Sequence, residues 1–223
     1  MKAVARRRLR FLGGFAAYFG ALWLLWETPL VYPLKIFVVL LHEISHGAAA
    51  IATGGSIERI VLTPDQGGAC YCAGGNAFLT LSAGYLGSLG WGGLILLAGE
   101  AKAVVARAAT GIVGTTVLTL TLLFVRNGFG LVFGLAFGAT LTASVRYLPA
   151  SAHSTLLTVL GLTSCLYAIL DIKSDVLDRP YLPSDAYMLA ELTGVPTLVW
   201  GTMWVALAAG ASWLLFRRAF RRA

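Results

Sequence analysis

A His-Glu-x-x-His motif, formed by His42, Glu43 and His46, lies inside the apolar run of residues 38–50. Residues four apart on a helix lie one above the other, so both imidazoles can bind the same Zn²⁺. Glu43 then lies beside the ion without being a ligand, where its carboxylate can take a proton from metal-bound water. The motif therefore predicts a zinc site for hydrolysis, with Glu43 as the catalytic general base.

The apolar surroundings of the motif argue against a purely structural pair of histidines. In a membrane span, ionisable groups on adjacent turns are costly and by default mark a functional site. The chain has only 3 His and 10 Asp plus Glu in 223 residues. Two of its imidazoles therefore occur at a metal-ligand spacing with a carboxylate between them, which favours the functional interpretation.

The composition indicates an integral membrane protein. Hydrophobic residues make up 58% of the chain and charged residues only 12%, whereas soluble domains carry about 25% charged residues. Much of the net charge of +7 comes from two basic segments, residues 6–10 and 217–222. Such flanks favour cytoplasmic anchoring or contact with anionic lipid. No basic groove interleaved with aromatic residues is visible, so we expect the lipid bilayer, and no nucleic acid, as a partner.

Long apolar runs predict an all-α polytopic membrane protein with about six to seven transmembrane helices. The runs are residues 11–26, 30–52, 78–97, 103–125, 129–145, 153–170 and 195–216. We expect them to form one integral membrane domain over residues 1–223. Seven crossings would put the two basic ends on opposite sides of the membrane, which the positive-inside rule disfavours. Either one run does not cross, or the C-terminal arginines lie outside.

A short β-hairpin is expected directly after the motif helix, within residues 53–77. Residues 56–63 are β-prone, residues 64–68 form a turn, and residues 69–72 can return as a second strand. The hairpin can be a simple connector. Alternatively, its open edge could take an unwound substrate segment as an added strand.

A zinc ion held by two imidazoles needs a third protein ligand, which leaves the fourth position for water. Asp171 is the preferred candidate, because the run 153–170 is parallel to the motif helix and ends in the same half of the membrane. Asp185 is the alternative, within the polar loop and short helix of residues 173–194. Ser184 can cap that helix, and the helix dipole alone already favours a carboxylate in its first turn.

The chain resembles the site-2 protease family, the intramembrane zinc metallopeptidases, and is similar to its compact branch without an inserted PDZ domain. The resemblance is carried by the motif in an apolar helix, the hairpin-like stretch after it, and the pairs Ala83-Gly84 and Leu170-Asp171. It implies zinc on His42, His46 and Asp171, with Glu43 as the general base. The family pattern Ala-Gly-Pro-x-x-Asn lacks its Pro and Asn here, and Leu-Asp-Gly ends in Ile172.

Together these observations indicate a zinc metalloprotease that cleaves transmembrane or membrane-anchored protein substrates, as in regulated intramembrane proteolysis. We expect a bacterial inner membrane, with the site towards the cytoplasmic side, because a first span leaving the cytoplasm would return the motif helix to it. Two other classes compete. A metal or proton transporter would place titratable residues along a path across the bilayer. A catalytically silent scaffold would keep the fold without needing the Glu43 carboxylate.

Overall fold

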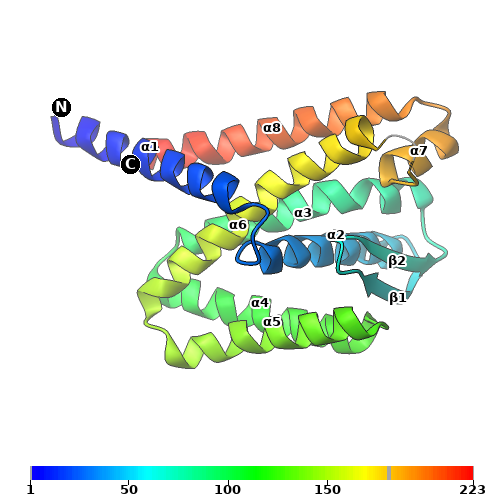
Figure 1. Cartoon of the computed structure of the whole chain (residues 1–223), viewed down its shortest axis with the longest axis horizontal. Helices are drawn as coiled ribbons and strands as arrows, with labels where there is room; N and C mark the ends of the chain where they lie inside the picture. The colour runs from blue at the N-terminus through cyan, green and yellow to red at the C-terminus, as the bar shows by residue number, and fades with distance from the viewer. Residues whose placement is uncertain (1, 180–181, 223) are drawn as a thin grey trace.

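The computed structural model describes residues 2–179 and 182–222, and Figure 1 shows a bundle of long helices with one small hairpin. The helices are α1 (Lys2–Leu25), α2 (Tyr32–Ala52), α3 (Ala77–Gly99), α4 (Ala103–Phe124), α5 (Gly128–Tyr147), α6 (Ala150–Lys173), α7 (Asp185–Thr193) and α8 (Thr197–Arg222). The hairpin is formed by β1 (Ser56–Leu62) and β2 (Gly68–Ala73), and a π-helical turn, η1 (Ser174–Asp178), extends α6. The predicted helical fold, with a hairpin after the motif helix, is confirmed.

Within the described residues, six helices are long and apolar enough to cross a membrane. They are α2, α3, α4, α5, α6 with its η1 extension, and α8. The chain is therefore an integral, multi-pass membrane protein. The first predicted run, residues 11–26, is largely helical but falls in α1, which is not among these six described candidates.

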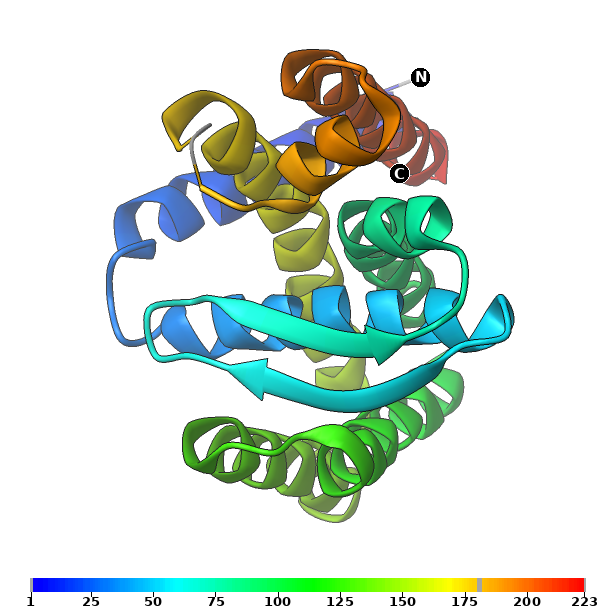
Figure 2. The ribbon, with the colours of Figure 1, turned by 90° about the vertical axis from the view of Figure 1, so that its right-hand side faces the viewer.

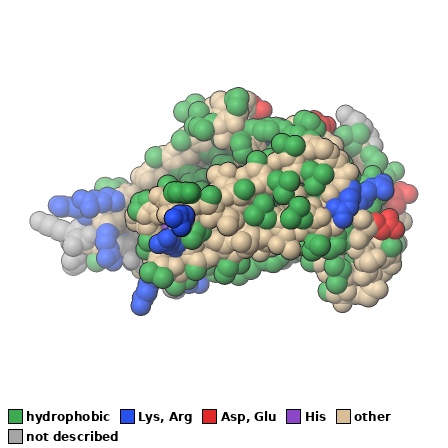
Figure 3. All heavy atoms as spheres, turned by 90° about the horizontal axis from the view of Figure 1, so that it is seen from below, with side chains coloured by type: hydrophobic (Ala, Val, Ile, Leu, Met, Phe, Trp, Pro, Cys, Tyr) green, Lys and Arg blue, Asp and Glu red, His purple; other side chains and the backbone are tan. Residues whose placement is uncertain are grey.

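Both ends of the described chain lie at the same end of the molecule (Figure 1). The Phe11 ring of α1 lies 5.7 Å from the Phe216 ring of α8, and Phe15 lies 5.0 Å from Phe216. The Arg8 guanidinium sits over the ring of Phe220. Figure 3 shows several groups of Lys and Arg side chains towards that end, and Asp and Glu side chains together with a further basic group towards the opposite end. The two basic segments therefore face the same side.

Helix α2 is the most enclosed of the six candidate spans. In its most apolar window 72% of the residues are buried, against 17% to 50% for the other five described spans. Its first half packs into the main core through Ile36, Phe37 and Leu40, which are fully buried. The polar motif in its second half consequently faces protein rather than lipid.

Helix α3 packs closely on both α2 and α6 because glycines line its contact faces. A Cβ built on Gly87 would collide with Ser45 of α2, and one on Gly92 would lie 2.9 Å from the Ser164 Cβ of α6. On α6, a Cβ on Gly161 would lie 2.7 Å from the Gly92 carbonyl oxygen. Small residues of this kind let helix backbones approach each other in a membrane. The close approach holds the first half of α3 against the motif.

The hairpin lies across the end of the molecule away from the termini (Figure 2). Strand β1 pairs antiparallel with β2, from Ser56 opposite Ala73 to Leu62 opposite Gly68, with an irregularity between Ile57 and Arg59. The outer edge of β1 is covered: Ile60 forms a parallel bridge with Val125, and the Asn127 side chain bonds both backbone groups of Leu62. No described backbone hydrogen bond joins β2 to an element other than β1.

Candidate metal centre

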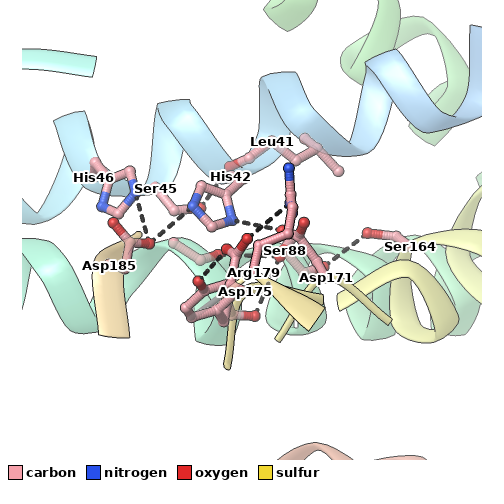
Figure 4. A network of polar contacts seen from close by, with 12 residues as sticks. Leu41, His42, Ser45, His46, Ser88, Ser164, Asp171, Asp175, Arg179 and Asp185 are labelled. Atoms are coloured by element: carbon pink, nitrogen blue, oxygen red, sulfur yellow. Dashed lines mark hydrogen bonds and ion pairs between the residues drawn. The ribbon is translucent and has the colours of Figure 1, made fainter. Parts of the chain in front are cut away.

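Two helices, α2 and α7, bring three possible ligands together. Helix α2 presents His42 and His46 on one face, and their Nε2 atoms lie 2.9 Å and 3.1 Å from Oδ2 of Asp185 (Figure 4). One ligand atom from each residue falls within 4.8 Å of the others. The cluster could hold a metal ion, and within the described residues it joins the two motif histidines to Asp185.

Asp185 reaches the histidines because the start of α7 is well anchored. The Ser184 hydroxyl caps the helix by accepting a hydrogen bond from the Tyr187 backbone N–H at 3.3 Å. Gly194, with φ 72°, ends the helix in the left-handed conformation that favours glycine. Ala186 and Leu189 are fully buried and pack with residues of α3, α6 and α8. The expected short helix, Asp185–Thr193 with a Ser184 cap, is present.

Asp185 lies outside the candidate spans, and its environment favours the ionised form of its carboxyl. Burial alone would raise the pKa of its carboxyl, but the charges and hydrogen bonds of His46 and His42 lower that pKa well below its ordinary value. A negative oxygen between two imidazole nitrogens is a suitable donor for a divalent cation.

His46 is already held in the orientation that a metal ligand needs. Its Nδ1 lies 2.7 Å from the backbone carbonyl of Thr80 in α3, so Nδ1–H donates there and Nε2 is the ring nitrogen that would bind a cation. Metal-ligating histidines generally make such a second contact, which sets the tautomer and the ring angle. Sequence reasoning did not find Thr80, because a backbone acceptor leaves no signature in side-chain types.

Gly84 of α3 leaves space at the ligand nitrogens. A Cβ at this position would lie 2.6 Å from both His46 Nε2 and His42 Cε1. Any larger residue would therefore fill the volume in front of the imidazoles. Two imidazole nitrogens and one carboxylate also form a donor set that Zn²⁺ uses in catalytic sites. The residues present fit the ion that the motif predicts.

Glu43 lies between the motif helix and the hairpin. Its side chain is buried, and a Cβ on Gly68, the first residue of β2, would lie 2.5 Å from Glu43 Oε1. A cavity of about 730 Å³ opens here, lined by Glu43, both motif histidines and β2. The carboxylate is therefore next to the ligand cluster and on the wall of a space that can receive a substrate.

Asp171, the preferred third ligand of the sequence argument, lies next to His42 but on the other side of its ring from Asp185 (Figure 4). Its Oδ2 is 3.7 Å from His42 Nδ1. It does not belong to the compact group of ligand atoms in the described residues. The direction of α6 correctly predicted that Asp171 would approach the motif, but not which imidazole nitrogen it would face.

Tyr85 is a further residue at the site, next to Gly84 on α3. Its ring meets the His42 ring edge to face at 5.0 Å, and its hydroxyl donates to Oδ2 of Asp175 at 2.5 Å. Arg179 also binds Asp175, through Nη2 at 2.9 Å. In the sequence, Tyr85 stands where the family pattern has Pro. That difference gives no indication of the contact with His42.

A family model described as Peptidase M50B-like matches residues 15–215. The chain belongs to this family. The family consists of metallopeptidases, and the matched region contains α2, α6 and α7 with all the ligand candidates. The resemblance to site-2 proteases is thereby confirmed, and no PDZ domain is found in this family member. No curated protein and no solved structure matches the chain.

Replacement of Gly84 tests the space in front of the histidines. We expect Gly84→Ala to weaken zinc binding by roughly tenfold or more, the range seen when the surroundings of a metal ligand are disturbed. The matched control is Gly90→Ala on the same helix, where a new Cβ meets nothing within 4 Å. Competition with a chromogenic chelator measures both affinities in detergent. Equal affinities in the two variants would contradict the assigned space.

Proposed function

We propose that this family member is an intramembrane zinc metalloprotease that hydrolyses peptide bonds of transmembrane or membrane-anchored proteins. The observation that carries the proposal is the cluster of His42, His46 and Asp185, with the buried Glu43 beside it, whose two histidines lie on an enclosed membrane helix. In this proposal Asp185 supplies the third ligand. A transporter is less well supported, because the clustered carboxylates lie around one end of α2 rather than along a path across the bundle.

Each residue has a distinct part in the proposed reaction. Zinc, when bound, supplies a Lewis acid that polarises a carbonyl and acidifies water. The Glu43 carboxylate takes the proton of the attacking water and later returns it to the leaving nitrogen. Its burial beneath Gly68 limits the motion of the carboxylate and keeps it directed at the cavity. Gly84 leaves the volume in which the reacting carbonyl can approach.

Strand β2 is the element that we propose to hold the substrate. A membrane helix keeps its carbonyls in backbone hydrogen bonds, so a substrate must unwind before it can be cut. The free edge of β2 can replace these bonds by strand addition without demanding a particular sequence. The covered outer edge of β1 supports this assignment, since only the β2 side of the described hairpin lacks a backbone partner and lines the cavity.

We also propose that the basic end of the molecule faces the cytoplasm of a bacterial inner membrane. The cytoplasmic site expected from the sequence required residues 11–26 to cross the membrane. With six crossings, both basic segments lie on one side, and α2 runs away from that side towards the site (Figure 1). The positive-inside rule then favours a site that opens on the outer face. At the site end, Lys173 and Arg179 are paired with Asp178 and Asp175.

An experiment can distinguish the role of the general base from that of the metal ligands. Glu43→Gln removes the proton acceptor and keeps the size of the side chain, so we expect turnover to fall by about 10²- to 10⁴-fold. Zinc content should stay at the wild-type value. Cleavage of single-span peptides in proteoliposomes, followed by mass spectrometry, measures the turnover. Glu191→Gln on the exposed face of α7 is the control for charge. Unchanged cleavage in Glu43→Gln would refute Glu43 as the general base. Absence of cleavage by zinc-loaded wild-type protein would refute the protease and favour a scaffold.

Labelling of single cysteines tests the orientation. We expect Glu58→Cys on β1 to react with a membrane-impermeant maleimide in intact bacterial spheroplasts. Lys102→Cys, at the end that carries the termini, should react only after permeabilisation. Both positions are exposed in the structure, and the wild-type chain sets the background from its own cysteines. The reverse pattern would instead put the site on the cytoplasmic side.

A further inference from the structure

One imidazole nitrogen of the ligand cluster lacks a hydrogen-bond partner. Nδ1 of His42 is buried and has no bonded partner among the described residues, whereas Nε2 of the same ring faces Asp185. The other motif histidine is different, because His46 Nδ1 lies 2.7 Å from the Thr80 carbonyl. A metal-binding histidine without a second contact is unusual, since that contact fixes the tautomer and the ring angle.

Asp171 is positioned to supply the missing contact. Its Oδ2 lies 3.7 Å from His42 Nδ1, with the Asp171 side chain 24% exposed and that of His42 13% exposed. This distance is longer than a direct hydrogen bond. A small rotation of the His42 ring or of the Asp171 side chain would close the gap. Figure 4 shows the His42 ring lying between Asp185 and Asp171.

The neighbouring carboxylate, Asp175, is not available for this role. Its Oδ2 accepts the Tyr85 hydroxyl and its Oδ1 accepts Arg179, so both oxygens already have partners. For Asp171, the one polar side-chain contact that the described residues provide is with His42. The remaining acidic groups around His42 are Glu43 on its own helix and Asp185 on the Nε2 side.

We propose that Asp171 is a positioning residue, not a ligand: its carboxylate accepts the Nδ1–H of His42 and so directs the Nε2 lone pair towards the zinc. Asp185 is then the carboxylate ligand. The inference rests on the proposed zinc site, and it replaces the role that the family resemblance implied for Asp171. Each motif histidine then has an acceptor for its Nδ1–H. The acceptor is a backbone carbonyl of α3 for His46 and a carboxylate of α6 for His42.

Zinc affinity separates a positioning residue from a ligand. We expect Asp171→Asn to weaken zinc binding by about 10- to 100-fold, the usual effect of losing an outer contact of a ligating histidine. The variant should still take up one equivalent of metal at saturation. Asp171→Glu, which keeps the carboxylate, should recover part of the affinity. Asp178→Asn removes a carboxylate that is bound to Lys173 in the same segment, and it should retain wild-type affinity.

Cobalt substitution provides the second measurement. The visible absorption of bound Co²⁺ reports the number and type of its ligands, so Asp171→Asn should keep the wild-type spectrum. Asp185→Asn should change the band positions and intensities. A changed spectrum in Asp171→Asn would make Asp171 a ligand, and an affinity equal to that of Asp178→Asn would make it irrelevant to the metal. Either result overturns the inference.

The same set of proteins distinguishes failure of this inference from failure of the proposed function. If folded wild-type protein takes up no zinc or cobalt, the metalloprotease proposal itself is wrong. Thermal unfolding of each metal-free variant shows whether the fold is intact. A metal-free Asp171→Asn that unfolds well below wild type, with no rescue of metal affinity by Asp171→Glu, would show that Asp171 serves the fold and would refute the positioning role.

Discussion

The structure depends on keeping a cluster of imidazoles and carboxylates away from lipid inside a membrane domain. Such groups are costly in hydrocarbon unless protein groups, water or an ion satisfy them. Helix α2 meets this constraint by lying at the centre of the bundle, so that Glu43 and His46 are buried and the motif borders a cavity rather than lipid. The carboxylate that we propose as a ligand, Asp185, comes from α7, a helix too short to cross the membrane, which the end of α6 and the start of α8 hold in place.

Glycines turn this central placement into a usable site. Because Gly84 and Gly87 have no side chain, α3 can approach the motif closely enough for the Thr80 carbonyl to reach His46 while leaving space at the ligand nitrogens. Gly68 has the same effect on the other side, where β2 passes over Glu43. The cavity therefore lies between two segments, α3 and β2, that approach the motif closely. Its width depends on the glycines of these segments, which have no Cβ, rather than on flexible side chains.

The hairpin and the charge distribution connect the site to its surroundings. The loop between α4 and α5 covers one edge of the hairpin, and the other edge, which has no backbone partner among the described residues, borders the cavity. Both basic segments lie at the far end of the bundle, close to each other through aromatic contacts of α1 and α8. The two basic segments and the candidate metal centre therefore lie at opposite ends of the molecule.

The sequence by itself determined the elements whose causes are local. The apolar runs, the turn before β2 and the Ser184 cap all depend on neighbouring residues, and each predicted a helix or strand that is observed, although the run 11–26 is not among the candidate spans of the described residues. Only the tertiary structure decided which carboxylate meets which imidazole nitrogen and on which side the termini meet. These depend on how α6, α7 and α1 pack, and that packing brings together residues more than a hundred positions apart, such as His42 and Asp185. No periodicity or spacing along the chain encodes such a contact.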